Sequence, residues 1–345
     1  MSLSKIISDH YHQSQYIFAY FIFVFLFVGL NYTADWGSYV SFLDSPYLCP
    51  DILFRFIAEC LQGSVSFTWV YKTHILLMGM LYLILIRRTV DFPFIAVLYA
   101  IDIYLYMANQ IRFYFAWPII LLSIYSFYKK EYVLFVVLAV IAVFSHKSVI
   151  LLLPAVFLCD FILCHVRFEK ALFLLTSMSI LIGSFTWFDF GSGFGFNQIY
   201  AYQRIAENIT FIGAIYNQIP YFVCLTVIIC VHQFILKVKQ NVLEDRIYRY
   251  LLILSLTPVI FVGISFYLIV FSQRFSQSMT LVWFMYLYWC YRKYSNSDLK
   301  CSIRIVSVII FIINPFFSCV YALIKQNFYN CLEIFKMIKS YGLFV

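Results

Sequence analysis

Long apolar segments follow one another along this chain, and they constrain its fold more than any other feature. Hydrophobic residues make up 64% of the 345 residues and charged residues only 12%, whereas a soluble domain carries about 25% charged residues. A helix needs about 20 apolar residues to cross a bilayer, and about eleven segments approach that length. The composition therefore predicts an all-α polytopic membrane protein and excludes a soluble domain of useful size.

The expected spans alternate with short polar connections. The first lacks the small-residue cleavage site of a signal peptide, so we interpret it as a retained helix. The whole chain, 1–345, is expected to form a single membrane domain, with longer outer loops at 32–65 and 189–216 and an interfacial tail at 325–345. The spans are expected at residues 15–31, 66–86, 92–109, 112–128, 131–146, 148–164, 171–188, 217–236, 249–271, 276–291 and 303–324.

Basic residues predict the orientation of these spans. Cytoplasmic loops of membrane proteins carry an excess of lysine and arginine. If the N-terminus with Lys5 is cytoplasmic, the basic doublets at 87–88, 129–130 and 292–293 all fall inside, whereas the outer loops carry only single cations. The net charge of +8 thus reflects orientation and points to no nucleic-acid partner. Ionisable residues that are expected to be partly buried in the bilayer fall on the outer side, which predicts a functional site there.

Two apolar stretches are expected to turn back within the membrane. A single helix over residues 92–128 would be about 55 Å long, far more than a bilayer. We therefore expect a hairpin turning at 109–112, and a second turning at 145–148 within 131–164. Each half is short for a full crossing, which predicts that Arg112 and His146 lie below the outer surface. A cation at that depth needs a partner or an anionic ligand.

The candidate site residues are cationic, acidic and aromatic. The guanidinium groups of Arg112, Arg204 and Arg274 suit phosphate oxygens in a cleft of low dielectric constant, although each could instead cap or snorkel at a helix end. His146, which is followed by Lys147, is a candidate general base because imidazole titrates near neutral pH. The alternative is a hydrogen-bonded histidine at the interface.

Asp35 and Glu59 are the acidic candidates in the first outer loop. Glu59 follows Arg55 by four residues, so a surface ion pair is the simpler interpretation of that pair. The loop lacks the adjacent acidic residues that metal-dependent membrane glycosyltransferases commonly carry, and we expect no metal site. Cys49 and Cys60 share the loop and could form a disulfide in an oxidising compartment. Outer aromatic residues could stack on sugar rings, among them Trp36, Tyr39, Tyr47, Tyr200 and Tyr202.

Four short stretches form a recognisable series along the chain. Asp35 and Tyr39 stand in an Asp-x-x-x-Tyr pattern after the first span, and residues 51–59 begin a further helix with an acidic residue. Residues 109–112 read Asn-Gln-x-Arg, and residues 144–148 read Phe-x-His-x-Ser. This series resembles the motifs of the EpsG/Wzy group of polysaccharide (O-antigen) polymerases. Gln273-Arg274-Phe275 fits a late arginine motif of that group, whereas Arg55 and Phe56 depart from its second motif.

The resemblance implies an enzyme of the bacterial inner membrane with its active site outside and a bundle resembling the GT-C class of membrane glycosyltransferases. Such enzymes join oligosaccharide repeat units carried on undecaprenyl diphosphate and release undecaprenyl diphosphate. Neither a metal, a nucleotide sugar nor another cofactor is expected. Membrane lipids are expected partners, and the resemblance also allows a chain-length regulator and a flippase as partner proteins.

The same resemblance suggests a role for each candidate residue. Arg112 and Arg274 would contact the diphosphate, His146 would act as a base or orient the acceptor, and Asp35 and Arg204 would contact the glycan. The further substrate-binding candidates are Tyr39, Glu59, Asn109, Gln110 and Lys147.

Two other classes of function stay open on sequence alone. A ligase that moves finished glycan onto lipid A core would use the same donor on the same side. A flippase or other transporter should carry polar residues near the membrane midplane, often in two related halves. Only Asp102, Asp160 and Asn314 are candidates for such depth, and no related halves stand out. These features favour a polymerase.

Overall fold

The computed structural model describes residues 3–187, 211–239, 241–265, 272–294 and 297–324, together with Lys336 and Lys339. All regular elements within these ranges are helices, so the expected all-α class is confirmed for them. The chain groups into two compact units, the first of residues 1–150 with 322–345 and the second of residues 151–321. The expectation of a single membrane domain stays a prediction.

The first unit is built around α7, which carries Arg112 in its first turn. Every residue from 116 to 126 is buried, Pro118 among them, and α7 packs against both α4 and α8, whereas α1 packs against α4 and α5. A helix enclosed in this way holds its terminal side chains in fixed positions. The helices of the unit are α1 Leu3–Val28, α2 Trp36–Asp44, α3 Ile52–Leu61, α4 Phe67–Thr89, α5 Phe94–Asp102, α6 Tyr104–Asn109, α7 Ile111–Tyr128 and α8 Tyr132–Ser145.

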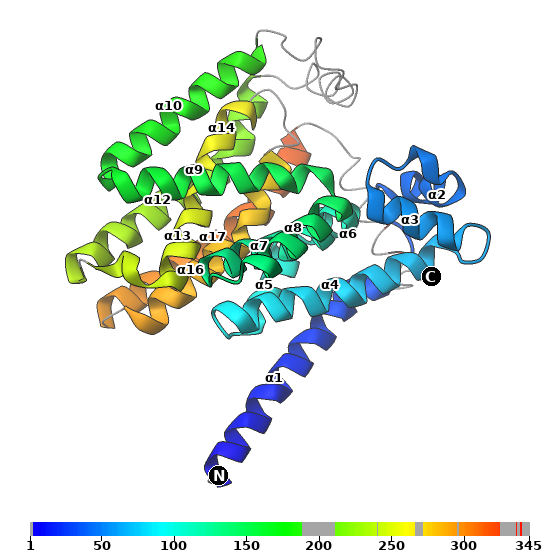
Figure 1. Ribbon diagram of the computed structural model, residues 1–345, viewed down its shortest axis with the longest axis horizontal. Coiled ribbons are helices and arrows are strands. Elements are labelled where there is room, and N and C mark those ends of the chain that lie inside the picture. Colours follow the sequence, from blue (N-terminus) through cyan, green and yellow to red (C-terminus); the bar gives the residue numbers. More distant parts are fainter. Residues whose placement is uncertain are drawn as a thin grey trace. The chain divides into compact units, whose positions relative to one another are not determined.

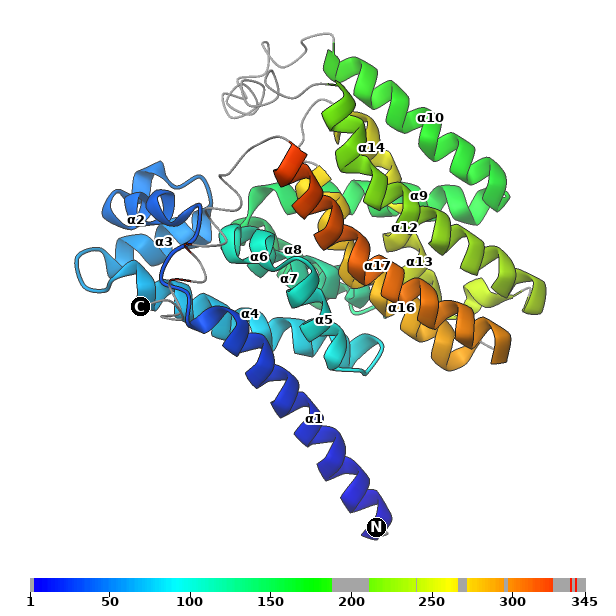
Figure 2. The ribbon, with the colours of Figure 1, turned by 180° about the vertical axis from the view of Figure 1, so that it is seen from behind.

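The expected outer loop at 32–65 contains two short helices, α2 and α3, next to each other at the beginning of α4 (Figures 1 and 2). Both are held by buried side chains four residues apart, Tyr39 with Leu43 in α2 and Phe54 with Ala58 in α3. This spacing places the two side chains of each helix on one face. The segment therefore forms a folded cap on the unit rather than an open loop.

Only the first of the two expected turns differs from the sequence prediction. The stretch at 92–109 is divided at Ile103 into α5 and α6, so the expected single span is wrong there. The break before Arg112 lies at Gln110, and α7 begins at Ile111. The expected break at 145–148 is confirmed, because α8 ends at Ser145 and His146 has an extended backbone (φ −158°, ψ 113°); that the chain forms a hairpin there stays a prediction.

The second unit contains the remaining helices. The expected span at 249–271 is interrupted at Thr257 and Pro258, where proline cannot donate the helical hydrogen bond. Residues 211–216, expected in the second outer loop, begin α12 instead. The rest of that loop, with Arg204 and the glycine-rich segment, lies outside the described residues. The helices are α9 Leu152–His165, α10 Phe168–Trp187, α12 Phe211–Val238, α13 Arg246–Leu256, α14 Val259–Ser265, α16 Thr280–Lys293 and most of α17 Ser297–Ile324.

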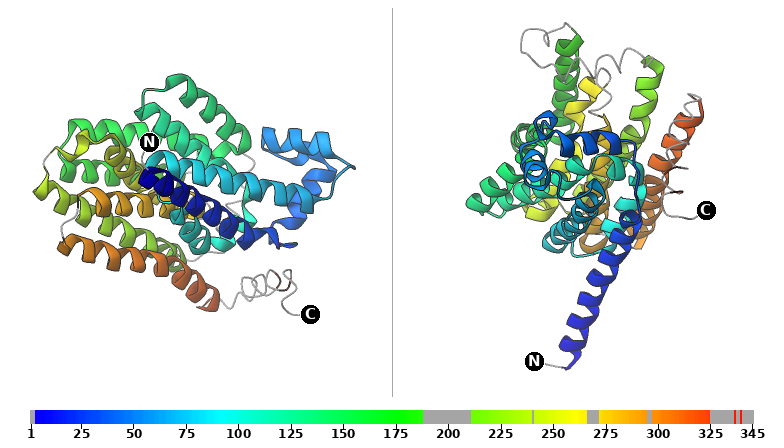
Figure 3. Two further views of the ribbon diagram at one scale, coloured as in Figure 1. Left: turned by 90° about the horizontal axis from the view of Figure 1, so that it is seen from below. Right: turned by 90° about the vertical axis from the view of Figure 1, so that its right-hand side faces the viewer.

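Several helices are suited to a membrane by length and composition. Within the described residues, six qualify: His10–Val28, Phe67–Thr89, Ile111–Tyr128, Lys147–His165, Gln218–Val238 and Arg246–Ser265. Large apolar side chains on α1, such as Phe18, Phe21 and Phe25, are exposed, and the N-terminal half of α1 extends beyond the other helices of its unit (Figures 1 and 3). Exposed apolar surface of this extent is typical of helices that face lipid. The chain is thus a multi-pass membrane protein, and the count of about eleven spans stays a prediction.

Ionisable residues of the first unit gather at the two ends of α4 and α7. At the far end from α2 and α3, Arg88 lies 3.9 Å from Glu131 and His12 lies 2.9 Å from Asp91. The first turn of α7, with Arg112, contacts the α2–α3 cap. The residues predicted on opposite sides of the membrane therefore occupy opposite ends of the unit. Which end faces the cytoplasm stays a prediction.

Two glycines allow α10 and α14 to pack closely in the second unit. A Cβ atom at Gly263 of α14 would lie 1.9 Å from the carbonyl oxygen of Ser179 in α10, and one at Gly183 would lie 2.8 Å from the Gly263 backbone. The Gly263 N–H donates a hydrogen bond of 2.7 Å to Ser179 Oγ. Small residues at such crossings let the backbones of membrane helices approach each other.

We predict that Gly263→Ala destabilises the second unit, by about 1–3 kcal/mol, because the added methyl forces α10 and α14 apart. The apparent unfolding temperature in detergent, followed by tryptophan fluorescence, should fall. Gly37→Ala is the matched control, since no atom lies within 4 Å of its Cβ position. An unchanged unfolding temperature for Gly263→Ala would contradict the close crossing.

Candidate functional site

The carboxylate of Asp51 joins three parts of the first unit. Its Oδ2 accepts a hydrogen bond from Arg112 Nη1 in an ion pair, which connects the start of α3 to the start of α7. Its Oδ1 accepts a hydrogen bond of 3.1 Å from the backbone N–H of Lys147, in the turn after α8. The Asp51 side chain is only 3% exposed. One buried acidic group therefore fixes the arginine turn and the histidine turn to the α2–α3 cap.

The local sequence explains why Asp51 points away from its own helix. Cys49 precedes Pro50 and has the extended backbone that proline imposes on the residue before it. Asp51 occupies the N-cap position of α3, but its side chain makes no capping hydrogen bond. Arg55, one turn later, donates through Nε and Nη2 to the Cys49 carbonyl oxygen at 3.0 and 2.7 Å. This contact stabilises the extended segment that presents Asp51 to Arg112.

Aromatic rings surround the Arg112 guanidinium. Its Cζ lies 5.4 Å from the ring centroid of Tyr39, 4.9 Å from Phe42 and 5.7 Å from Phe54, within the range of cation–π attraction. The Arg112 side chain is 15% exposed. Its Nη1 lies 3.4 Å from Cys49 Sγ, whereas the buried Nε has no hydrogen-bond partner within the described part of the chain. Arg112 is thus held rigidly, with one buried N–H that makes no hydrogen bond within the described part of the chain.

His146 is buried, and its hydrogen bonds indicate its tautomer. Nδ1 accepts the backbone N–H of Ser148 at 3.3 Å and lies 2.9 Å from Ser148 Oγ. A backbone N–H can only donate, so Nδ1 is the acceptor and the neutral ring carries its proton on Nε2. The ring also meets Phe113 edge-on, with centroids 5.4 Å apart. In this geometry His146 presents a hydrogen-bond donor rather than a basic nitrogen.

Tyr39 and Cys49 stay uncharged in this site. Burial raises the pKa of the Tyr39 phenol to about 12, because desolvation outweighs the lowering effect of the Arg112 charge. Burial likewise raises the pKa of the Cys49 thiol. A neutral phenol and a neutral thiol carry no charge, so the charge in this site comes from Arg112, Asp51 and Asp35.

The structure brings most other predicted residues of the first unit to the same region. Asn109 Oδ1 accepts the backbone N–H of Ala34 at 2.8 Å, and so holds the chain just before Asp35. Asp35 is half-buried at the start of α2, and its carbonyl oxygen accepts the Tyr39 N–H at 3.1 Å. Gln110 joins α6 to α7. Its Oε1 is buried without a hydrogen-bond partner among the described residues.

Four predicted residues stand apart from this cluster. The Lys147 and Glu59 side chains are exposed, and no ion pair within the described ranges joins Glu59 to Arg55. Arg274 belongs to the second unit, where it lies in the π-helical turn Ser272–Ser276. Arg204 lies outside the described residues.

The disulfide alternative is wrong in this structure, because Cys49 and Cys60 are free thiols. Among the described residues, no group of three His, Cys, Asp or Glu side chains could hold a metal ion.

Sequence reasoning missed Asp51 as a site residue, together with the rings of Phe42 and Phe54. The sequence indicates a motif that begins at Asp51, but it points to Glu59 as the functional member. The available signal was Asp51's place directly after Cys49-Pro50 and before a helix. A carboxylate there either caps its own helix or serves another partner.

The fold and the site together define a class of protein. It is a multi-pass helical membrane protein in which an arginine enclosed by aromatic rings and a buried histidine lie at one end of a helical unit. A family model described as the EpsG family matches residues 15–332. The chain therefore belongs to the EpsG family, and this membership makes it a polysaccharide-polymerase-like membrane protein. No curated protein and no solved structure is significantly similar to it.

We predict that Asp51→Asn lowers the apparent unfolding temperature by roughly 5 °C or more, because it leaves Arg112 buried without its counter-ion. Arg112→Gln in the same chain should recover part of the loss, since neither partner is then charged. Glu59→Gln, an exposed acid on the same helix, is the control and should change little. Additive losses in the double variant would show that the Asp51–Arg112 pair does not stabilise the site.

Proposed function

We propose that this protein polymerises oligosaccharide repeat units linked to undecaprenyl diphosphate into O-antigen or another surface polysaccharide. The reaction would take place at the outer face of the bacterial inner membrane. The observation that carries this proposal is the Arg112 site: a guanidinium held by three rings and Asp51, with an unused Nε–H, beside the His146 turn. Membership of the EpsG family supports a polymerase.

The proposed reaction exchanges one bond at the anomeric carbon of the donor glycan. A hydroxyl oxygen of the acceptor repeat unit forms a bond to that carbon, and the bond from the carbon to the diphosphate oxygen breaks. The bonding electrons leave with undecaprenyl diphosphate, which also takes up the proton of the hydroxyl. The transferred glycan stays attached to the acceptor's lipid carrier. The balance requires no metal, oxidant or nucleotide sugar.

Arg112 would stabilise the negative charge that grows on the departing diphosphate. A preorganised donor at such a position typically contributes about 10²–10³ in rate. Asp51 already neutralises much of the Arg112 charge, so a second cation is needed for a dianionic group. The exposed ammonium of Lys147, one residue from His146, supplies one, and Arg274 is proposed as another contact. Asp51 is then a positioning residue that sets the direction of the guanidinium.

His146 would orient a substrate oxygen through Nε2–H. Of the two roles that the sequence suggests, base or orienting group, the Ser148 hydrogen bonds favour the second. A donor at Nε2 can hold the acceptor hydroxyl or a phosphate oxygen. The glycan itself would contact Asp35 and Tyr39, with Arg204, Glu59, Asn109 and Gln110 as further candidates. The lipid tails would remain in the membrane, and a chain-length regulator and a flippase are proposed as partners.

The transporter alternative gains little support from Asp160, one of the acidic residues expected at depth. Asp160 accepts hydrogen bonds from Arg249 Nε and Nη2 at 2.8 and 2.6 Å within the second unit. A carboxylate bound in this way serves helix packing rather than a transport path. A ligase with the same donor stays the nearest alternative, and the phenotype of a deletion separates it from a polymerase.

We predict that a strain lacking this protein makes single capped repeat units in place of a polysaccharide ladder on a gel. Wild-type protein should restore the ladder, whereas Arg112→Ala should abolish it and His146→Ala should reduce it by about tenfold or more. Arg112→Lys, which keeps the charge but loses the fork of donors, should restore little.

The matched control is Arg88→Ala, which removes a half-exposed cation from the other end of the same unit. This variant should restore the ladder fully, and immunoblots of membranes should show equal amounts of every variant. Long chains that accumulate on the lipid carrier would indicate a ligase instead. An unchanged ladder in the deletion strain would overturn the proposed polymerase.

A further inference from the structure

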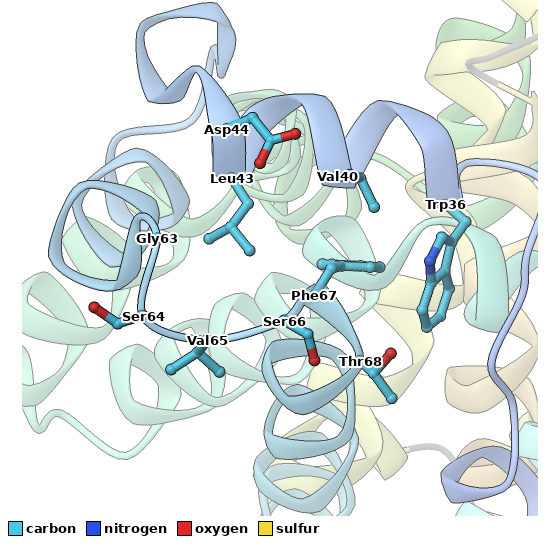
Figure 4. A pocket seen from close by; sticks show the side chains of 10 residues that line it. All are labelled: Trp36, Val40, Leu43, Asp44, Gly63, Ser64, Val65, Ser66, Phe67 and Thr68. Carbon is cyan, nitrogen blue, oxygen red and sulfur yellow. The ribbon is translucent and has the colours of Figure 1, made fainter.

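A pocket of about 500 Å³ lies between α2 and the segment that leads into α4. Figure 4 shows that Trp36, Val40, Leu43 and Asp44 come from α2, whereas residues 63–68 form the other side. Gly63 turns the chain with φ +71°, a conformation that favours glycine. Gln62 Nε2 donates a hydrogen bond of 2.6 Å to the Asp44 carbonyl oxygen and so holds the two sides together.

Stacked aromatic rings connect this pocket to the Arg112 site. The Phe67 ring, which lines the pocket, stacks on Tyr39 with centroids 5.3 Å apart and planes 12° apart. Tyr39 in turn lies under the Arg112 guanidinium. Trp36 meets Phe67 edge-on at 4.6 Å and lies 5.2 Å from Tyr71. The pocket wall is therefore a packed aromatic cluster, separated from Arg112 by two rings.

The chemistry of the lining suits a sugar ring. The half-buried Trp36 ring offers apolar surface to the C–H face of a pyranose, the buried Phe67 ring forms part of the wall, and Ser64, Ser66 and Thr68 bring hydroxyls to the same pocket. Among the described residues that line it, none is a lysine, arginine or histidine, so these residues offer no cation to a phosphate group. The mixture of hydroxyls with rings also differs from the uniformly apolar surface that a lipid tail prefers.

We infer that this pocket is a glycan subsite, which binds neutral or amino sugars of the repeat unit beside the Arg112 site and disfavours acidic sugars. This inference rests on the proposed function, since it assigns a place to the glycan of the same reaction.

Asp44 is the residue that carries the selectivity. Among the described residues of the lining it is the one ionisable group, and it lies at the end of α2, eight residues from Trp36. That separation spans about 12 Å of helix, so a sugar chain can lie along α2 with Trp36 near one end and Asp44 near the other. The carboxylate attracts an ammonium, accepts hydroxyl protons, and repels the carboxylate of a uronic acid.

The experiment measures binding of methyl glycosides of glucose, glucosamine and glucuronic acid to the full-length protein in lipid nanodiscs. Saturation-transfer NMR detects binding at millimolar concentration. Glucosamine and glucose should bind, and glucuronic acid should bind at least about threefold more weakly. Asp44→Asn should remove most of this difference. The control Glu169→Gln, an exposed acid on α10 in the second unit, should leave it unchanged.

A second variant blocks the pocket without disturbing the packed rings. Ser66 is exposed and makes no capping hydrogen bond at the start of α4, so Ser66→Trp should fold with an unchanged unfolding temperature and reduce binding of all three sugars by about tenfold or more. The inference is overturned if wild-type protein shows no saturation transfer, if glucuronic acid binds as well as glucosamine, or if Ser66→Trp binds like wild type.

The polysaccharide ladder separates failure of this inference from failure of the proposed function. Ser66→Trp should shorten or abolish the ladder. If Ser66→Trp gives a wild-type ladder while Arg112→Ala gives none, the polymerase stands and the glycan subsite is wrong. If sugars bind as expected while Arg112→Ala keeps the ladder, the subsite stands and the assignment of the catalytic site is wrong.

Discussion

The first unit of this membrane protein depends on the ion pair between Asp51 and Arg112. A guanidinium that is 15% exposed at the start of a buried helix would be strongly unfavourable without a counter-ion. Asp51 supplies that counter-ion, and its second oxygen accepts the Lys147 N–H. The same carboxylate therefore sets the positions of α3, α7 and the His146 turn. The contacts of Arg112 with Cys49 Sγ and with the three rings of the cap add to this anchor.

This arrangement explains why a nearly neutral pair can still serve an anionic substrate. Arg112 directs one nitrogen to Asp51, and the rings of Tyr39, Phe42 and Phe54 fix its plane, while Nε–H stays unused. A donor fixed in advance needs little reorganisation when charge develops beside it. The proposed polymerase therefore depends more on the direction of this donor than on the net charge of the site.

Part of this site could be predicted from the sequence. The turns at Arg112 and His146 were predictable, because each interrupts an apolar run too long for one span and too short for two full ones. Asp51 was not, since its partner is 61 residues away along the chain and no local pattern reveals that contact. The break at Ile103 follows no Pro or Gly, and the helices α2 and α3 depend on packing of Tyr39 and Phe54 that propensity alone does not give.

The most direct test of this site is a cryo-electron microscopy structure of the protein in nanodiscs with undecaprenyl diphosphate. We predict density for the diphosphate in contact with the Arg112 guanidinium, next to the His146 turn, and loss of that density in Arg112→Ala. Diphosphate bound elsewhere, with the Asp51–Arg112 pair unchanged and remote from it, would contradict the central claim that this pair organises the site of sugar transfer.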